Sequence, residues 1–167
     1  MQPEKKYKRR EARDIPGHSH MLTFSTRKRS PHLLNEQICL WLAGAISKAG
    51  TTQGFTVLAY VFMPDHVHLL IRPSRETYKI ADILKSIKQG VSRRALIAGL
   101  IQDVLWEPGG GHDRNIFTEE ARANAINYIH FNPVRKGLCS DIMEYRWSSA
   151  RSILLDEAGE IEVDRSW

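Results

Sequence analysis

The sequence has little cysteine and no long apolar run. Its two cysteines, Cys39 and Cys139, lack the close spacing of a metal-binding pair, and we expect free thiols in a cytoplasmic protein. No stretch approaches the roughly 18 consecutive apolar residues that a membrane-spanning helix needs. The basic N-terminus lacks the apolar core of a secretory signal. We therefore expect neither a secreted protein stabilised by disulfide bonds nor a membrane protein.

Acidic residues are too few to balance the basic ones. The 167 residues include 24 lysines and arginines against 19 aspartates and glutamates, a formal net charge of +5. This excess favours a polyanionic partner, nucleic acid first. Segment 1–16 is basic with few apolar groups, which is typical of a flexible arm, and segment 155–167 is a weakly patterned acidic tail. Residues 17–154 then form one folded domain.

Two histidines on one predicted strand are the most informative feature. An apolar run at 55–62 and the turn residues 63–65 precede His66 and His68, which predicts strand, turn and second strand at 66–72. Side chains alternate along a strand, so both imidazoles face one side. Such a pair can grip a divalent metal ion at two points. The alternative is two half-buried histidines with local hydrogen bonds.

The remaining elements follow from apolar spacing and turn residues. We expect strands at 20–26 and 104–106, helices at 33–49 and 78–98, a glycine-containing loop at 107–115, and a last helix from Thr118 to about Asn132. Pro133 is expected to stop that helix, and Gly137 to close its exit. The order β-α-β-β-α-β predicts an α+β fold, the ferredoxin-like split βαβ sandwich with an antiparallel sheet and an added C-terminal helix.

Basic residues cluster at two places outside the N-terminal arm. Such clusters are often only solvated surface, but they can also follow a phosphate backbone. The candidates for DNA binding on the second helix are Lys79, Lys85, Lys88, Arg93 and Arg94. Those after the first strand are Arg27, Lys28 and Arg29.

Tyr128 and Asn132 lie four residues apart on the last helix and therefore share a face. Either residue alone would be read as a packed aromatic or a helix cap. His130 falls on roughly the opposite side, where a structural or surface role is expected. A second histidine pair, His18 and His20, lies at the entrance of the first strand and is expected to be a polar lead-in rather than a metal site.

Four segments in order resemble a known family. They are residues 64–68, Trp106 with 109–116, residues 128–138, and residues 147–149. Together they resemble the REP-associated tyrosine transposases, members of the single-tyrosine HUH superfamily, in which U is a bulky apolar residue. The similarity runs from about Gly17 to Arg151. One departure is His112, where the family has an aromatic residue, often tyrosine.

The resemblance implies an enzyme that nicks and rejoins single-stranded, hairpin-forming DNA such as REP-like repeats. By motif match, Tyr128 becomes the nucleophile that forms a 5′-phosphotyrosine intermediate, and His66, His68 and Asn132 become ligands of Mg²⁺ or Mn²⁺. Relatives of this kind imply a monomer or a homodimer. The alternative is a domesticated protein that binds a nucleic-acid hairpin without cutting it.

Overall fold

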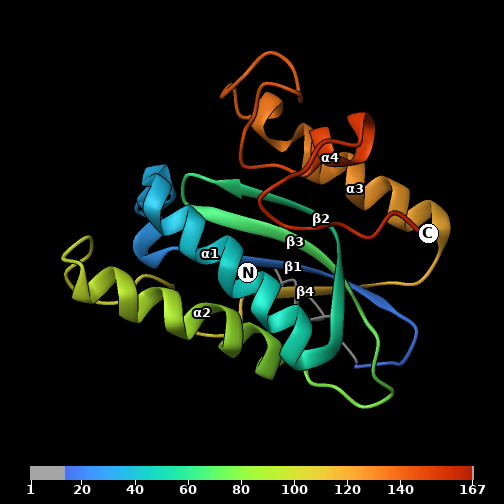
Figure 1. Cartoon of the computed structure of the whole chain (residues 1–167), viewed down its shortest axis with the longest axis horizontal. Helices are drawn as coiled ribbons and strands as arrows, with labels where there is room; N and C mark the ends of the chain where they lie inside the picture. Colours follow the sequence, from blue (N-terminus) through green and yellow to red (C-terminus); the bar gives the residue numbers. More distant parts are fainter. Residues whose placement is uncertain (1–13, 167) are drawn as a thin grey trace, which may run out of the picture.

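A single antiparallel sheet organises the protein (Figure 1). The computed structural model describes residues 14–166, so nearly all of the expected arm at 1–16 lies outside the described residues. The strands are β1 (Ser19–Ser25), β2 (Phe55–Met63), β3 (His66–Pro73) and β4 (His112–Ile116), in the order β2-β3-β1-β4. All neighbouring strands are antiparallel. The predicted α+β ferredoxin-like arrangement is therefore confirmed.

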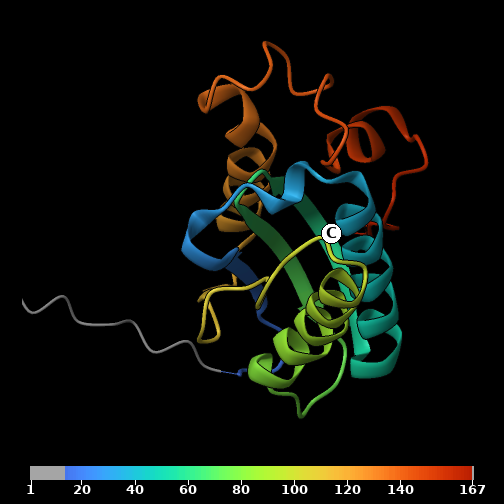
Figure 2. The same cartoon turned by 90° about the vertical axis from the view of Figure 1, so that its left-hand side faces the viewer.

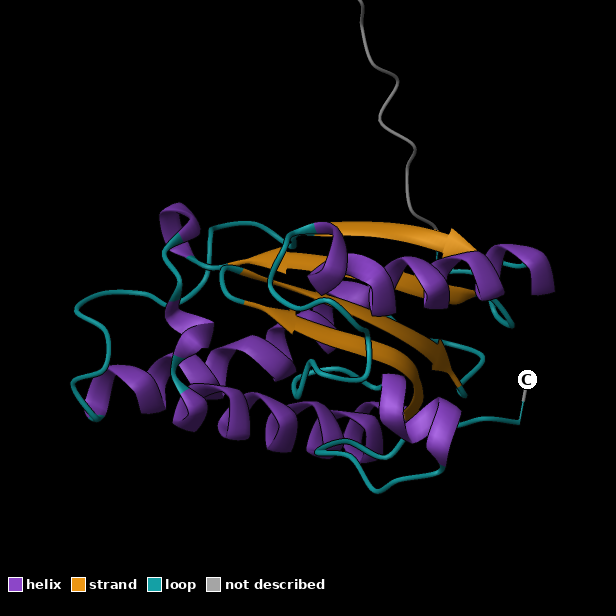
Figure 3. Cartoon of the chain, turned by 90° about the horizontal axis from the view of Figure 1, so that it is seen from above, coloured by secondary structure: helices purple, strands orange, loops and turns teal. Residues whose placement is uncertain are grey.

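Helices cover both faces of the sheet (Figures 2 and 3). The helices α1 (Glu36–Ala49) and α2 (Ile80–Ile97) lie on one face, and α3 (Glu119–Arg135) lies on the other. A short helix, α4 (Ala150–Leu155), follows a segment that bonds to β2. Tight helical turns at Arg27–Arg29 and His32–Leu34 precede α1, and a wide turn at Gly50–Gly54 follows it.

Two apolar cores fill the space between these layers. The first lies under α1 and α2 and includes Val67, Leu69 and Ile71 from β3. The second lies under α3 and includes Leu70 from the same strand. The alternation along β3 therefore turns His66 and His68 towards α3, as the sequence pattern predicts. None of the helices in the part of the chain that the structure describes is long and apolar enough to cross a membrane.

The fourth strand does not lie at 104–106. There Trp106 makes only an isolated bridge with Thr26, and its indole N–H donates to the carbonyl of Lys88. The strand is His112–Ile116, within the segment expected to be a loop. Gly111 has a φ of +79°, and a Cβ there would lie 2.4 Å from the backbone oxygen of Thr23. Glycine thus allows the close approach to β1 from which β4 begins.

Helix α3 passes through Pro133 and ends three residues later than the sequence pattern predicts. Proline lacks the N–H that would bond to the carbonyl of Ile129, but it lies in the last turn, where little helix remains to be disrupted. Gly137 ends the helix with a φ of +70°, donating its N–H to Val134, while Leu138 donates to Pro133. These two bonds form a Schellman motif.

The helix starts also differ slightly from expectation. Helix α1 begins at Glu36 rather than 33, because the Asn35 side chain accepts hydrogen bonds from the N–H groups of Gln37 and Ile38 and so caps it. Helix α2 begins at Ile80 rather than 78.

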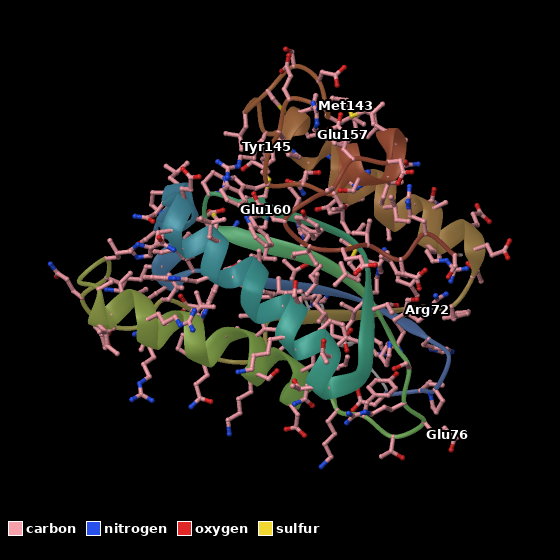
Figure 4. The ribbon with its side chains drawn as sticks, viewed as in Figure 1. Arg72, Glu76, Met143, Tyr145, Glu157 and Glu160 are labelled. Atoms are coloured by element: carbon pink, nitrogen blue, oxygen red, sulfur yellow. The ribbon has the colours of Figure 1, made fainter. Side chains whose placement is uncertain are left out.

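C-terminal residues line the outer edge of β2. Ser149 donates its N–H to the carbonyl of Tyr60, and Trp147 accepts from Phe62. Further along, Asp164 donates its N–H to the carbonyl of Val57 and pairs with the Arg72 guanidinium at 2.5 Å. Arg72 is labelled in Figure 4. The acidic segment expected at 155–167 therefore packs, over its described residues, along the sheet.

Candidate active site

His66 and His68 stand side by side in the gap between β3 and α3. Their side chains are almost fully buried, and their Nε2 atoms lie 3.2 Å apart. The rings meet nearly at right angles, with centroids 4.8 Å apart. Two ring nitrogens are thus presented to one small region.

Neighbouring oxygens hold the other ring nitrogens. Nδ1 of His66 lies 2.6 Å from Oδ1 of Asp65. Because a carboxylate only accepts, Nδ1 of His66 carries the hydrogen and its Nε2 keeps a lone pair. Nδ1 of His68 bonds to Oγ1 of Thr23 at 2.9 Å, across the β1–β3 register. These contacts orient both rings.

Both imidazoles are neutral near pH 7. Burial lowers the pKa of His66, and the neighbouring Asp65 only partly opposes this. Burial also lowers the pKa of His68 to about 4, with further lowering by His66, Arg135 and Arg29. A neutral imidazole is the form that binds a metal ion.

Tyr128 lies next to the histidine pair. Its ring centroid is 5.3 Å from that of His68, and 42% of the residue is exposed. Tyr128 and His68 line a hollow of about 480 Å³. The other lining residues are Met21, Thr23, His112, Arg114 and Asn124. A side chain in the wall of an open hollow can meet a substrate from solvent.

Asn132 is buried one helical turn beyond Tyr128. Its Oδ1 atom has no hydrogen-bond partner among the residues that the structure describes. Arg135, the last residue of the helix, and Lys136, which caps its C-terminus, interact electrostatically with His68 and His66, respectively. Asn132 therefore belongs to the stretch of α3 that runs along the pair. An orphaned amide oxygen is a suitable ligand for a cation.

These donors could hold a divalent ion. Within residues 14–166, no group of three or more His, Cys, Asp or Glu side chains could do so. Two imidazole nitrogens with the Asn132 oxygen are a different donor set, and they suit Mn²⁺ or Mg²⁺ with water and phosphate oxygens completing the shell. The buried, unpaired oxygen of Asn132 fits this use.

Arg29 is the predicted DNA-binding residue that lies against the site. Its Nε is 3.1 Å from Oδ2 of Asp65, the carboxylate that holds His66. Arg29 and Lys28 both have left-handed backbone angles, with φ of 55° and 51°. The Lys28 N–H donates to a Glu107 side-chain oxygen, which helps to hold the turn.

The basic residues of α2 lie away from the histidines. That helix packs on the opposite face of the sheet from α3 (Figure 2). Lys85, Lys88 and Arg93 line a hollow of about 630 Å³ between α2 and residues 103–110. Arg94 lines a different groove between α1 and α2, and Lys79 precedes the first turn of α2. The structure thus does not bring these five cations to the site.

Two other histidines, His20 and His130, have structural surroundings. His20 lies within β1, as the expected strand at 20–26 predicts, but it is fully buried and not a polar lead-in. It bonds to Asp113 at 2.9 Å and to the Tyr78 hydroxyl at 2.8 Å. His130 is buried and bonds to Oγ of Ser149, consistent with a structural role.

A family model described as "Transposase IS200 like" matches residues 16–109, more than half of the chain. The chain belongs to the IS200-like transposase family. The matched region includes the histidine pair and ends before α3.

Two relatives support the narrower resemblance. The REP-associated tyrosine transposase of Escherichia coli K12 is 26% identical over 153 residues, 88% of each chain. A solved structure of a REP-associated tyrosine transposase bound to a REP hairpin has a TM-score of 0.73 and 22% identity, covering 93% of this chain and 95% of that one. The family resemblance inferred from the motifs is therefore confirmed, and this IS200-like transposase shares the fold of that structure.

Several neighbours of the site carry no sequence signal of their own. Thr23 is identified only by the register that places it opposite His68. Arg114 reaches the hollow because β4 lies where a loop is expected. The position of Asp65 next to His66 in the sequence was a possible signal that the two side chains interact. Arg135 lies near the site because α3 extends beyond the end that the sequence predicts.

Proposed function

We propose that this IS200-like transposase nicks and rejoins single-stranded, hairpin-forming DNA, with Tyr128 as the nucleophile. The observation that carries the proposal is the meeting of Tyr128 with His66 and His68 at an open hollow. The relatives support the substrate class, because one is named a REP-associated tyrosine transposase and the other is bound to a REP hairpin.

His66, His68 and Asn132 would hold Mg²⁺ or Mn²⁺. When bound, such an ion neutralises and polarises the phosphodiester, which an oxyanion cannot otherwise approach easily. Asp65 and Thr23 would keep the two imidazoles oriented for this binding.

Tyr128 would then exchange one ester bond for another. Its Oη forms a bond to phosphorus, and the bond from phosphorus to the 3′ oxygen breaks. The phenolic proton leaves, and the released 3′ oxygen takes up a proton as a hydroxyl. The 5′ end stays attached as a phosphotyrosine. A 3′-hydroxyl can reverse the exchange and join strands without ATP, because the ester energy is retained.

Basic residues on two surfaces would hold the DNA backbone. Arg29, with Arg27 and Lys28, would contact the strand near the scissile bond. The cations of α2 lie across the sheet from the histidines, so they would hold a more distant part of the hairpin. Phosphate contacts of this kind supply affinity without reading sequence.

Replacing Tyr128 by phenylalanine tests the proposal. The parent protein, with hairpin DNA and Mn²⁺ or Mg²⁺, should form a denaturation-resistant adduct that peptide mass spectrometry maps to Tyr128. Tyr128→Phe keeps the ring and should bind the hairpin normally without cutting it. Tyr145→Phe is the matched control and should still form the adduct, since Tyr145 donates its hydroxyl to the carbonyl of Phe62 elsewhere.

Two outcomes would overturn parts of the proposal. An adduct on Tyr60, Tyr78 or Tyr145 would refute the nucleophile but keep the enzyme class. No adduct with either metal, on a hairpin that the protein demonstrably binds, would instead support the hairpin-binding protein without cleavage activity.

A further inference from the structure

Arg135 lies directly over the ring of Tyr128. Its guanidinium carbon is 4.3 Å from the ring centroid, and Nη2 donates to the backbone carbonyl of Tyr128 at 2.6 Å. Among residues 14–166, no acidic side chain pairs with it. The guanidinium is therefore held by the candidate nucleophile and not by a carboxylate.

The unexpected length of α3 creates this contact. Arg135 is the last residue of the helix, seven positions and about two turns after Tyr128, so the two share a face. Helical side chains lean towards the N-terminus, which carries the guanidinium back over the ring. If the helix ended at Asn132, helical geometry would no longer place Arg135 over the ring of Tyr128.

The contact with Arg135 restrains the Tyr128 side chain, which few other residues cover. Tyr128 is 42% exposed, so its ring has open space on the side of the hollow. The planar guanidinium covers one ring face while its bond to the backbone carbonyl fixes its own position. The ring is thus in contact with both Arg135 and His68, whose ring lies across it at 78°. In-line attack requires such a fixed approach.

We propose that Arg135 is a positioning residue that holds the Tyr128 ring in its attacking orientation beside His68. The planar fork matters as well as the charge, because it lies over the ring and bonds to the carbonyl at the same time. A lysine ammonium would supply the charge without the planar group. The proposal rests on the proposed function of Tyr128 as the nucleophile.

The test compares Arg135→Gln and Arg135→Lys with a matched control. Arg75 also donates to a backbone carbonyl, that of Thr52 at 2.8 Å, but it follows the opposite end of β3 from His66. Arg135→Gln should slow adduct formation on saturating hairpin DNA by about tenfold to a hundredfold, as small misplacements of reacting groups do. Arg135→Lys should recover only part of this loss. Arg75→Gln should react at the parental rate.

A second readout uses the free protein. In carbon–proton spectra of ring-labelled tyrosine, Arg135→Gln should shift the Tyr128 ring signals and leave those of the other tyrosines in place. Parental adduct rates in Arg135→Gln, full recovery in Arg135→Lys, or unmoved Tyr128 signals would each overturn the positioning role. If the parent protein forms no adduct at all, the proposed function fails, while the spectra still decide whether Arg135 orders the ring.

Discussion

Oδ1 of Asp65 lies 2.6 Å from Nδ1 of His66, and this contact decides which nitrogen of His66 is free. The opposite carboxylate oxygen pairs with Nε of Arg29, a residue held in a left-handed backbone conformation. A chain of three groups therefore orients the imidazole. The same chain connects the basic turn after β1 to the candidate metal site.

Asp65→Asn should weaken metal binding. An amide oxygen accepts less strongly than a carboxylate, and an amide can also rotate to present its NH₂ group to His66. We expect Mn²⁺ affinity, measured by calorimetry, to fall about 10- to 100-fold, the range seen for partners of metal-bound histidines. Asp103→Asn, an exposed carboxylate by α2, is the matched control. Equal Mn²⁺ affinity in both variants would show that Asp65 has no such role.

His66→Ala or His68→Ala should abolish divalent-dependent nicking while the fold persists. Each change removes one imidazole from a strand whose opposite face stays packed in the first core. We expect a loss of about 1 kcal/mol in the free energy of unfolding, measured with urea. A variant that still cuts the hairpin at the parental rate would exclude the two-histidine site.

Neutralising Lys85 and Lys88 should weaken hairpin binding without slowing the chemistry. Both residues line the hollow by α2, on the opposite side of the sheet from Tyr128. Each lost phosphate contact should reduce the log–log slope of affinity against salt by about 0.7 for single strands. The rate of adduct formation at saturating DNA should stay parental. An unchanged slope would move the binding surface to the basic arm or to the Arg27–Arg29 turn.

His130 should contribute to acid sensitivity. Burial lowers its pKa from the ordinary 6.5 to about 4, so the folded state binds fewer protons than the unfolded state between these values. Its contribution is therefore present above about pH 6.5 and is lost as the pH falls towards 4, up to about 3 kcal/mol.

Urea unfolding at several pH values checks this prediction. His130→Gln can keep a hydrogen bond to Ser149 but cannot titrate, so stability should fall less steeply from pH 6.5 to 4 than in the parent. A parental slope in His130→Gln would contradict the assignment.

Gly111→Ala should destabilise the fold strongly, whereas Gly110→Ala should not. An added Cβ at Gly111 would lie 2.4 Å from the backbone oxygen of Thr23, at a φ of +79°. At Gly110 the nearest atom is a Leu84 methyl at 3.9 Å, an ordinary contact. We expect Gly111→Ala to cost at least about 2 kcal/mol, measured by thermal unfolding. Similar melting temperatures for the two variants would mean that β4 can shift away from β1 without a loss of stability.

Alternating apolar residues made the histidine strand predictable. Val67, Leu69 and Ile71 must face one core, which leaves only the other face for His66 and His68. The helix that carries Tyr128 was predictable for a different reason, since Thr118 caps its start and Glu119 and Glu120 follow in the first turn. Both inferences depend on patterns within a single element.

Long-range geometry was not predictable in the same way. Strand β4 is short and mostly polar, and β1 is its sole neighbour in the sheet, so no apolar alternation marks it. The apolar residues Val104, Leu105 and Trp106 suggest a strand, yet Trp106 is buried by its side-chain contacts. The continuation of α3 through Pro133 depends on the terminal bonds around Gly137, which the expected stop at proline did not take into account.

The C-terminal residues along β2 also cover an edge of the sheet. An uncovered edge strand offers its free N–H and C=O groups to other chains, and this is a common first step of ordered aggregation. Here Ser149 and Asp164 occupy carbonyls of that edge, and the Arg72–Asp164 pair places charge beside it. We therefore expect these residues to oppose intermolecular sheet growth, so that their loss would appear first as insoluble protein.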